Sequence, residues 1–514
     1  EALALIKREN PLPAICGRVC NRRCEDACTR GRVDAAVAID EVKKFIAQRD
    51  LDAATRYVPP VVTPTRAGGF DQKIAIIGAG PAGLSCAFYL AEKGYKPVVF
   101  EKNERPGGML TYGIPSFKLQ KDVIEAEVEI IRLMGAEFRY GVEVGRDVTL
   151  DELRAQGFKA FYVAIGCQGG RLAGIPGEDA EDVTVAVDFL REVNSGKIDS
   201  LSGRTIVVGG GNVAIDVARN ACRLGSEHVE MFCLESEAQM PASEEERREA
   251  VEDGAHISCG WGPKEIHLDE AGRVCGITFK RCTRVFDDEG RFAPEYDEND
   301  LRRVDADRVV MSIGQSIVWG DLLAGSKVEL GRGQGALADP QTYQTAEPDI
   351  FVGGDVYTGP SFAIDAIAAG HEAAVSIHRF VQPGSTLTIG RNQRRYTALD
   401  RDDVVLESYD NASREVAHVD REREKAAPFS EYVETFTEEQ VRAETARCLG
   451  CGASIVDPNK CIGCGLCTTK CAFDAIHLDR DRPECSTMVK YEQKLPSLGK
   501  YALKRAIKIK FGKK

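Results

Sequence analysis

Two glycine-rich turns constrain the fold of this chain more than any other feature of its sequence. Each turn lies between an apolar run and a segment with helical periodicity, first in KIAIIGAGPAGLSCAFYLAEKGYKPVVFEK and again in RTIVVGGGNVAIDVARNACRLGSEHVEMFCLES. A strand, a glycine turn, a helix and a second strand in that order form a βαβ unit, whose two strands are parallel. The two units therefore predict an α/β protein with two parallel sheets.

The first turn has the spacing G-x-G-x-x-G. In Rossmann-like folds the first glycine permits the tight turn, the second lets a pyrophosphate approach the backbone, and the third allows the helix to pack closely on the strand. The phosphate then meets the free N–H groups at the helix N-terminus. An acid that ends the second strand can accept hydrogen bonds from a ribose. We predict a dinucleotide site that includes Gly78, Gly80, Pro81, Gly83 and Glu101.

The second turn reads G-x-G-x-x-A, with Gly209, Gly211 and Ala214, and Asn212 opens its helix. This pattern predicts a second Rossmann-like dinucleotide site. Glu235 follows the second strand of this unit. A carboxylate in that position hydrogen-bonds a free 2′-hydroxyl and repels a 2′-phosphate, so we expect Glu235 to favour a nucleotide without that phosphate.

The cysteines are clustered, with four of the 18 in residues 16–28 and seven in residues 448–485. In a large chain without a signal peptide, clustered cysteines predict metal sites in the cytoplasm, not a disulfide framework. The stretch CIGCGLCTTKC has the spacing C-x2-C-x2-C-x3-C, which is typical of 4Fe–4S ligation, with zinc as the alternative. Cys461, Cys464 and Cys467 would hold one cluster, and Cys471 would reach a neighbouring cluster. The seven cysteines of the middle show no ligand spacing and are interpreted as buried small hydrophobes.

The other clustered cysteines leave alternatives open. Cys16, Cys20, Cys24 and Cys28 recur at every fourth residue, which suits either one stripe along a continuous helix or a turn that gathers four thiols around a 4Fe–4S cluster. We favour the turn. At the other end of the chain, Cys448, Cys451 and the stretch CIGCGLCTTKC together predict a ferredoxin-like module. This module would hold either two clusters, with Cys485 as a further ligand, or one cluster, with the other thiols unused. The chain would then carry two or three clusters.

The middle of the chain resembles two-domain flavoproteins of the glutathione-reductase type. The resemblance rests on GGM, which includes Gly108 and Met109, on GGD, which includes Gly354 and Asp355, and on the crossover segments AIGCQGG and MSIGQ. It implies FAD in the first fold and a nicotinamide nucleotide in the second, so Glu235 favours NADH over NADPH, although Arg247 and Arg248 could still reach a phosphate. Residues 66–385 carry no redox C-x-x-C, which disfavours a thiol reductase. Because hydride transfer needs alignment and no acid or base, no catalytic residue is nominated.

The order of motifs is similar to a narrower group, which comprises the small subunit of glutamate synthase, the amino-terminal half of dihydropyrimidine dehydrogenase and the flavin subunit of electron-bifurcating ferredoxin:NADP oxidoreductases. The resemblance rests on PLPAICGRVC, GAGPAGL, GGMLTYGIP, GGGNVAID and GGDVYTGPS. Three features of this sequence depart from the group. The R-C-L-x-C segment that lies upstream in the group has a counterpart here only in ARCLGCG, near the carboxyl end. Lys43 stands where relatives offer Glu or Gln as a cluster ligand, and Leu234-Glu235 replaces the arginine pair that binds the 2′-phosphate.

These observations predict six regions. They are a helical Fe–S domain (1–60), an FAD domain (66–190 and 340–385), an NAD(P) domain (191–339), a charged linker (386–447), a ferredoxin-like α+β module (448–485) and a basic tail (486–514). The tail suits either a solvated helix or docking to an acidic partner. The net charge of −13 argues against nucleic acid, and no apolar run is long enough to span a membrane.

The predicted function is an FAD and iron–sulfur electron-transfer subunit that exchanges hydride with NAD(P)H and single electrons with a ferredoxin or partner subunit. Three alternatives remain. The chain could belong to an electron-bifurcating NADH/NADPH/ferredoxin transhydrogenase, or it could act alone as an NAD(P)H-dependent reductase of a small molecule. A structural adaptor with vestigial nucleotide folds is a third, weaker possibility.

Overall fold

The computed structural model describes residues 1–62, 69–382, 384–389, 391, 409–451, 461–470, 476–478 and 491–511. The chain forms two compact units. The first comprises Glu1–Arg391 and Val404–Leu449, and the second comprises Asn392–Asp403 and Gly450–Lys514. The two dinucleotide-binding folds and the amino-terminal cysteines all belong to the first unit.

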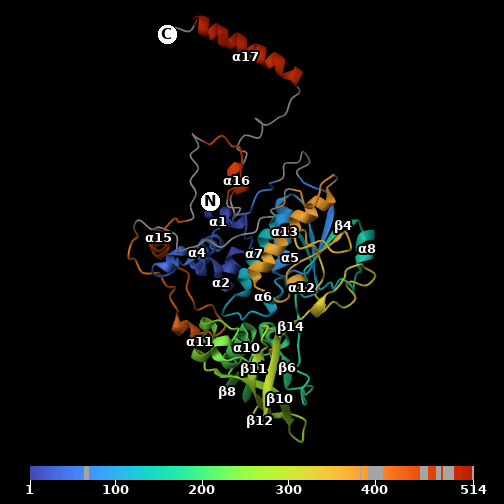
Figure 1. Cartoon of the computed structure of the whole chain (residues 1–514), viewed down its shortest axis with the longest axis vertical. Helices are drawn as coiled ribbons and strands as arrows, with labels where there is room; N and C mark the ends of the chain where they lie inside the picture. Colours follow the sequence, from blue (N-terminus) through green and yellow to red (C-terminus); the bar gives the residue numbers. More distant parts are fainter. Residues whose placement is uncertain are drawn as a thin grey trace. The chain divides into compact units, whose positions relative to one another are not determined.

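The first fold is a five-stranded parallel sheet in the order β15-β4-β1-β2-β3. Alternating residues of β1 face two cores: Ile74 and Ile76 pack under helices, whereas Ala75 and Ile77 pack against the opposite layer. Figure 1 shows helices α5 and α13 side by side on the helical face. The bounds are β1 Lys73–Ile77, β2 Val98–Glu101, β3 Glu137–Tyr140, β4 Phe158–Val163, β15 Ile350–Val352, α5 Pro81–Glu92, α7 Lys121–Leu133, α8 Leu150–Ala155 and α13 Ala363–Val381.

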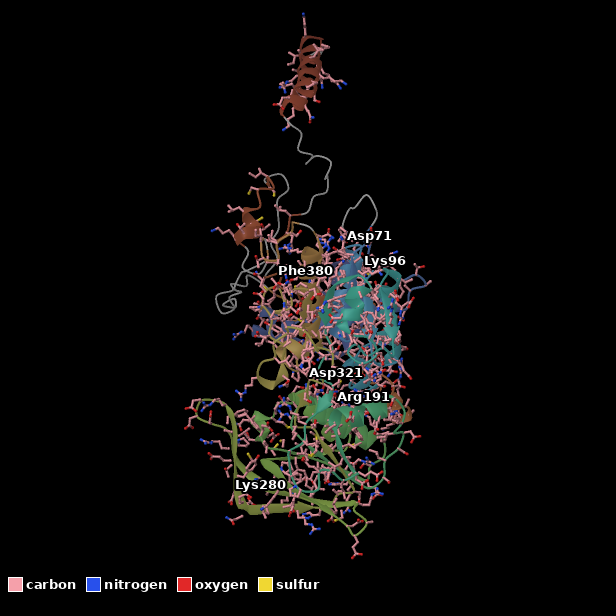
Figure 2. The ribbon with its side chains drawn as sticks, turned by 90° about the vertical axis from the view of Figure 1, so that its right-hand side faces the viewer. Asp71, Lys96, Arg191, Lys280, Asp321 and Phe380 are labelled. Atoms are coloured by element: carbon pink, nitrogen blue, oxygen red, sulfur yellow. The ribbon has the colours of Figure 1, made fainter. Side chains whose placement is uncertain are left out.

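The second fold repeats this plan with a parallel sheet in the order β6-β13-β7-β8-β9. Helices α9, α10 and α11 cover one face, and an antiparallel sheet of β10, β11 and β12 covers the other. In Figure 2, Lys280 on β11 lies toward the outer end of this fold. The bounds are β6 Val183–Val185, β7 Arg204–Val208, β8 His228–Cys233, β9 His256–Cys259, β10 Trp261–Leu268, β11 Val274–Phe286, β12 Phe292–Val304, β13 Arg308–Met311, α9 Ala186–Asn194, α10 Asn212–Arg223 and α11 Glu244–Glu252.

The chain crosses between the two folds twice, and the two crossings pair with each other. β5 (Gly169–Gly170) and β14 (Gln315–Ser316) form a two-stranded antiparallel ladder. The second sheet starts at β6, earlier than the predicted boundary at residue 190. On the return, Ile317 and Leu322 already pack in the core of the first fold, well before the predicted boundary at residue 340.

The amino-terminal region is helical, as its pattern predicts, and it packs on the first fold. Leu12, Ala14 and Ile15 are buried in the same core as α5 and α13. The buried Lys7–Glu127 ion pair joins this region to α7. The bounds are α1 Ala2–Lys7, α2 Pro13–Val19, α3 Arg23–Asp26, the 3-10 helix Thr29–Arg32 and α4 Ile39–Leu51.

The segment predicted as a charged linker is folded over residues 409–449, where it contains α14 (Arg421–Ala426) and α15 (Glu438–Ala446). Several of its charges are buried, whereas others, such as Arg442, are exposed. Arg447 is 1% exposed and its Nη1 lies 2.7 Å from Glu444, which is fully buried and accepts a hydrogen bond from the Ala38 N–H. Arg30 in turn donates to the Arg447 carbonyl. Because each buried charge has a partner, a run that looks like a solvated linker packs against the amino-terminal helices. We call residues 409–449 the strap.

The second unit contains helices α16 (Leu466–Lys470) and α17 (Tyr491–Phe511). Apolar side chains of α17, including Leu498 and Ile509, are exposed, between cations of the predicted basic tail. Most of the predicted ferredoxin-like module lies outside the described residues. Among the helices that the structure describes, none is both long and apolar enough to cross a membrane.

Candidate functional site

The first glycine turn has the geometry that its spacing predicts. Gly78 has a φ of +105°, and a Cβ there would lie 2.4 Å from the Ala164 carbonyl oxygen. A Cβ on Gly83 would lie 1.9 Å from the Gly78 oxygen, so only glycine lets α5 approach β1 this closely. A Cβ on Gly80 would meet nothing within 4 Å. The backbone at Gly80 and the N-terminus of α5, which opens with Pro81, therefore face open space that fits a pyrophosphate.

Glu101 lies beside this turn but also has a role within the protein. Its side chain accepts hydrogen bonds from the Ala79 N–H at 2.8 Å and from the Asn103 N–H at 2.9 Å, and the residue is 2% exposed. The carboxylate thus holds the glycine turn against the end of β2. Its two oxygens retain acceptor capacity toward the cavity that Glu101 helps to line.

Two further loops of the first fold complete its side of the cavity. Gly108 and Gly354 have φ angles of +54° and +67°, and they immediately precede the short helices α6 (Met109–Tyr112) and α12 (Asp355–Thr358). Asp355 accepts a hydrogen bond from the Ser361 N–H at 3.3 Å. Burial raises the pKa of the Asp355 carboxyl to about 6, against the opposing effect of that hydrogen bond. Its carboxyl group therefore remains mostly ionised at neutral pH, although it takes up a proton more readily than an exposed aspartate.

The second glycine turn has the same features. Gly209 has a φ of +144°, and a Cβ there would lie 2.3 Å from the Ser312 oxygen, whereas a Cβ on Gly211 would meet nothing within 4 Å. Ala214 is fully buried where α10 packs on its sheet. The Glu235 carboxylate lies beside this turn, because a Cβ on Gly210 would be 3.0 Å from its Oε2. That position suits contact with a nucleotide ribose.

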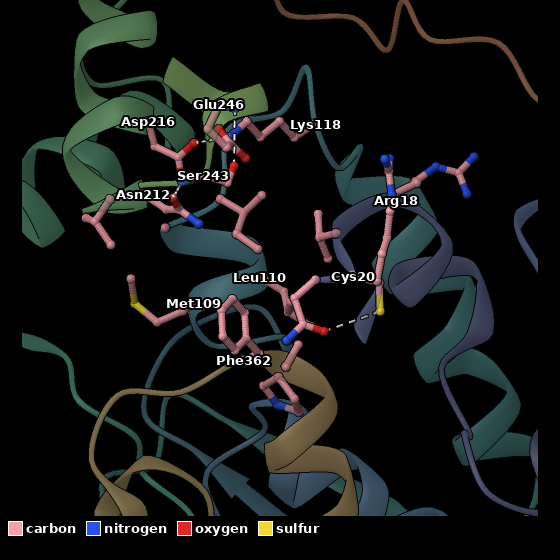
Figure 3. A pocket seen from close by; sticks show the side chains of 18 of the residues that line it. Arg18, Cys20, Met109, Leu110, Lys118, Asn212, Asp216, Ser243, Glu246 and Phe362 are labelled. Atoms are coloured by element: carbon pink, nitrogen blue, oxygen red, sulfur yellow. Dashed lines mark hydrogen bonds and ion pairs between the residues drawn. The ribbon is translucent and has the colours of Figure 1, made fainter. Parts of the chain in front are cut away.

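The first glycine turn, the start of α10 at Asn212 and the cysteine-rich segment border one cavity of about 960 Å³. Figure 3 shows its side chains: Cys20 from the amino-terminal region, Met109 and Phe362 from the first fold, and Asn212 and Ser243 from the second. Asn212 accepts a hydrogen bond from the Ser243 N–H at 3.2 Å, which ties α10 to the start of α11. The cavity volume is of the size expected for a cofactor site.

An ion-pair cluster that sequence reasoning missed crosses this cavity from one fold to the other. The Lys118 ammonium, on the loop before α7, lies 2.6 Å from the Asp216 carboxylate on α10 and also pairs with Glu246 on α11 (Figure 3). Burial raises the pKa of Asp216 to about 6, and Lys118 acts in the opposite direction. No spacing in the sequence links residues this far apart, so the cluster had no detectable signal.

The amino-terminal cysteines do not lie on one continuous helix. Cys16 is buried in α2, which ends at Val19, and Cys24 lies in α3 after the left-handed Arg22 (φ 53°). Cys20 and Cys28 flank these short helices, so the chain turns between the thiols. Burial raises the pKa of both the Cys16 and the Cys24 thiol, and the positive charge of Lys43 acts in the opposite direction. Four thiols within thirteen residues suit an iron–sulfur cluster, with Lys43 as a nearby cation.

The carboxy-terminal cysteines are divided between the two units. Cys448 follows α15 in the first unit, and its N–H donates to Thr445. Cys451, Cys461, Cys464 and Cys467 are exposed in the second unit, while Cys471 and Cys485 lie outside the described residues. Within the described part of the chain, no three His, Cys, Asp or Glu side chains converge on a point that could hold a metal ion. The cysteine assignments therefore remain predictions from spacing.

Three families match the sequence. Pyridine nucleotide-disulphide oxidoreductase matches residues 72–370, which is more than half of the chain. Dihydropyrimidine dehydrogenase domain II, 4Fe-4S cluster, matches residues 1–55, and the 4Fe-4S binding domain matches residues 454–477. These matches confirm the predicted fold class and the presence of FAD/NAD(P)-binding and 4Fe–4S domains.

Named relatives cover much of the chain. The NADP(+)-dependent formate dehydrogenase subunit beta of Moorella thermoacetica is 35% identical and covers 88% of this chain and 67% of its own. The glutamate synthase [NADPH] small chain of Escherichia coli K12 is 36% identical, and the match covers 74% of this chain and 83% of that protein. The NAD-dependent dihydropyrimidine dehydrogenase subunit PreT of the same organism is 33% identical, and the match covers 74% of this chain and 85% of that protein. Mycobacterium tuberculosis FprA in complex with NADPH shares the fold, at 19% identity and a TM-score of 0.52 over 60% of this chain and 84% of its own. The predicted resemblance is confirmed.

Proposed function

The chain belongs to the pyridine nucleotide-disulphide oxidoreductase family, and we propose that it is the flavin-containing electron-transfer subunit of a larger oxidoreductase complex. It is an FAD/NAD(P)-dependent oxidoreductase with 4Fe–4S domains, and its named relatives include subunits of multi-subunit enzymes. The observation that carries the proposal is the shared cavity. It is bordered by the first glycine turn, by Asn212 of the second and by Cys20 of the cysteine-rich segment.

The residues around this cavity have separate tasks in the proposed reaction. Bound FAD would accept the two electrons of a hydride and release them singly, as 4Fe–4S clusters require. Gly80 and the α5 N-terminus would bind its pyrophosphate, while Gly211 and the α10 N-terminus would bind that of the nicotinamide nucleotide. Lys118, Asp216 and Glu246 would hold the second fold at the orientation that aligns the two rings.

We propose that NADH is favoured over NADPH, because the Glu235 carboxylate lies beside the second glycine turn. A carboxylate there accepts a hydrogen bond from a free 2′-hydroxyl and repels a 2′-phosphate. Arg247 is engaged elsewhere, since its Nη1 donates to the Glu237 carbonyl at 2.7 Å. The relatives include both NAD- and NADP-dependent proteins, so the preference rests on this geometry alone.

Replacement of this carboxylate by a cation is expected to change the preferred nucleotide. In Glu235→Arg, the ratio of flavin reduction rates with NADPH and NADH should rise by about 10-fold or more, because a repulsive charge becomes a hydrogen-bonding partner for the phosphate. Rapid-mixing measurements of flavin bleaching with each nucleotide provide the test. Glu237→Arg, on the adjoining 3-10 helix Glu237–Gln239, is the control for added positive charge. An unchanged ratio in Glu235→Arg would show that this side chain does not contact the ribose.

We propose further that the amino-terminal cysteines Cys16, Cys20, Cys24 and Cys28 hold one cluster, and that the carboxy-terminal module holds one or two more. Cysteine spacing supports this division. Electrons would pass from the flavin through the clusters to a ferredoxin or a partner subunit. The cytoplasmic location likewise remains a prediction from cysteine usage.

The proposed function is tested by anaerobic purification with partner proteins retained, followed by flavin and iron analysis and addition of NADH. We expect about one FAD and at least eight iron atoms per chain, since each 4Fe–4S cluster holds four iron atoms and two or three clusters are expected. We also expect NADH to bleach the flavin and then to produce the paramagnetic signal of reduced clusters. Flavin reduction without any cluster signal would contradict the electron-transfer role and would favour a reductase that acts alone.

A further inference from the structure

We propose that Arg23, through its ion pair with Asp365, positions the amino-terminal cysteine turn against the flavin site and thereby sets the rate of electron transfer between them. This inference rests on the proposed function. The turn in question spans Cys20 to Asp26, between α2 and the end of α3, and it contains two of the predicted cluster ligands.

The contact between Arg23 and the first fold is specific in its geometry. The guanidinium is bidentate, with Nη1 2.8 Å from Asp365 Oδ1 and Nη2 3.2 Å from Oδ2. The same guanidinium lies 5.1 Å from the centre of the Phe362 ring, a cation–π arrangement. The Arg23 side chain is 59% exposed, so its orientation depends on the paired fork and the aromatic face together, which a lysine could not reproduce.

Asp365 is itself held in place. It lies in the first turn of α13, where a carboxylate is stabilised by the helix dipole, and its Oδ2 accepts a hydrogen bond from the Ser361 hydroxyl at 2.7 Å. The Ser361 N–H donates to Asp355, the predicted flavin-binding acid. A short relay of polar contacts thus connects Asp355 through Ser361 and Asp365 to Arg23, which directly precedes Cys24 in the chain.

Residues at both ends of this relay border the cavity of the functional site. Phe362, Asp355, Cys20 and Arg23 all border it, together with the first glycine turn, and Figure 3 shows Cys20 and Phe362 around the same space. Electron tunnelling slows steeply as the donor and the acceptor move apart. A contact that holds the cysteine turn close to the flavin site therefore affects the rate of electron transfer between the flavin and the cluster.

Other residues of the turn are paired with different parts of the chain. Arg22 lies 3.4 Å from Glu245 on α11, and Glu25 accepts from the Asp40 N–H and pairs with Arg414 of the strap. Those contacts can keep the turn folded after loss of the Arg23–Asp365 pair. A variant at Asp365 should therefore shift the turn relative to the flavin side without unfolding it.

The test uses the anaerobic full-length holoprotein and the variant Asp365→Asn, which keeps the shape of the side chain and removes its charge. After mixing with NADH, flavin bleaching should keep its wild-type rate, while the subsequent cluster reduction, followed by freeze-quench paramagnetic resonance, should slow by about 10-fold. Iron content should be unchanged. Hydrogen exchange of residues 20–28 should become faster, which is a readout independent of turnover.

Two further variants make the result decisive. Arg23→Lys keeps the charge but not the bidentate pair, so it should slow cluster reduction as well. Arg49→Ala is the matched control, because it removes an exposed ion pair with Glu438 elsewhere on the helical region and should leave both phases unchanged. Cluster reduction at the wild-type rate in Asp365→Asn overturns the proposal. Loss of iron in both Asp365→Asn and Arg23→Lys also overturns it, because that result would indicate a purely structural role. If wild-type flavin were not reduced by NADH at all, the proposed function itself would fail.

Discussion

Gly80→Val is expected to yield a folded protein that has lost its FAD, while Gly211→Val is expected to retain FAD and lose affinity for the nicotinamide nucleotide. Both glycines have φ angles that valine can adopt, −75° and −90°, and a Cβ at either position meets nothing within 4 Å. The added side chain would instead fill the space before a helix N-terminus. Loss of hydrogen bonds to a charged pyrophosphate, about 1.5–3 kcal/mol each, corresponds to roughly 10–100-fold weaker binding.

Each variant of this pair is the control for the other. FAD content is read from the absorbance of the purified protein, and nucleotide affinity from titration of the flavin-loaded form. Gly83→Ala is a contrasting variant, because its Cβ would lie 1.9 Å from the Gly78 oxygen, and it should lower the yield of folded protein. If Gly80→Val kept full FAD, or if both valine variants lost the same cofactor, the assignment of the two folds would be wrong.

Cys20→Ser is expected to abolish the amino-terminal cluster and to slow electron delivery from the flavin to one-electron acceptors by roughly 100-fold, at the upper end of the effects seen for altered metal sites. Reduction of the flavin by NADH should continue, because neither glycine turn is changed. Iron analysis and paramagnetic resonance of the reduced protein measure the first effect, and rapid mixing measures the second.

Cys275→Ser provides the comparison for this change. Cys275 lies on β11, where its Sγ contacts the His267 carbonyl, and the sequence assigns it no ligand role. Its replacement should leave iron content and both rates as in the wild type. Equal iron content in Cys20→Ser and in the wild type would refute the assignment of Cys20 as a ligand.

Local sequence patterns were sufficient to predict the two glycine turns. A steric requirement such as that at Gly78 or Gly209 is met within a few residues of the chain, so spacing alone reveals it. The position of Glu235 beside its turn follows from the same short-range geometry. The sequence predicted that Glu101 accepts hydrogen bonds from a ribose, but it did not reveal that the carboxylate also accepts from the Ala79 N–H.

Long-range pairing explains what the sequence did not reveal. Residues 409–449 are rich in charge, and a charged run ordinarily predicts solvent exposure. Arg447 and Glu444 are nevertheless buried, because their partners lie some 400 residues earlier in the chain. The Lys118 cluster was missed for the same reason, since Asp216 and Glu246 are 98 and 128 residues away.

The contacts between the strap and the amino-terminal helices are expected to delay the maturation of this protein. Arg30 is 2% exposed, and its guanidinium donates to a carbonyl 417 residues later. A ribosome adding roughly 5–20 residues per second would need about 20–80 s to synthesise that stretch. Until then the first helices lack several partners for their buried charges, although their cysteines have already emerged. Assembly of the proposed amino-terminal cluster should therefore be a late step of biogenesis, even though its predicted ligands are translated long before the strap.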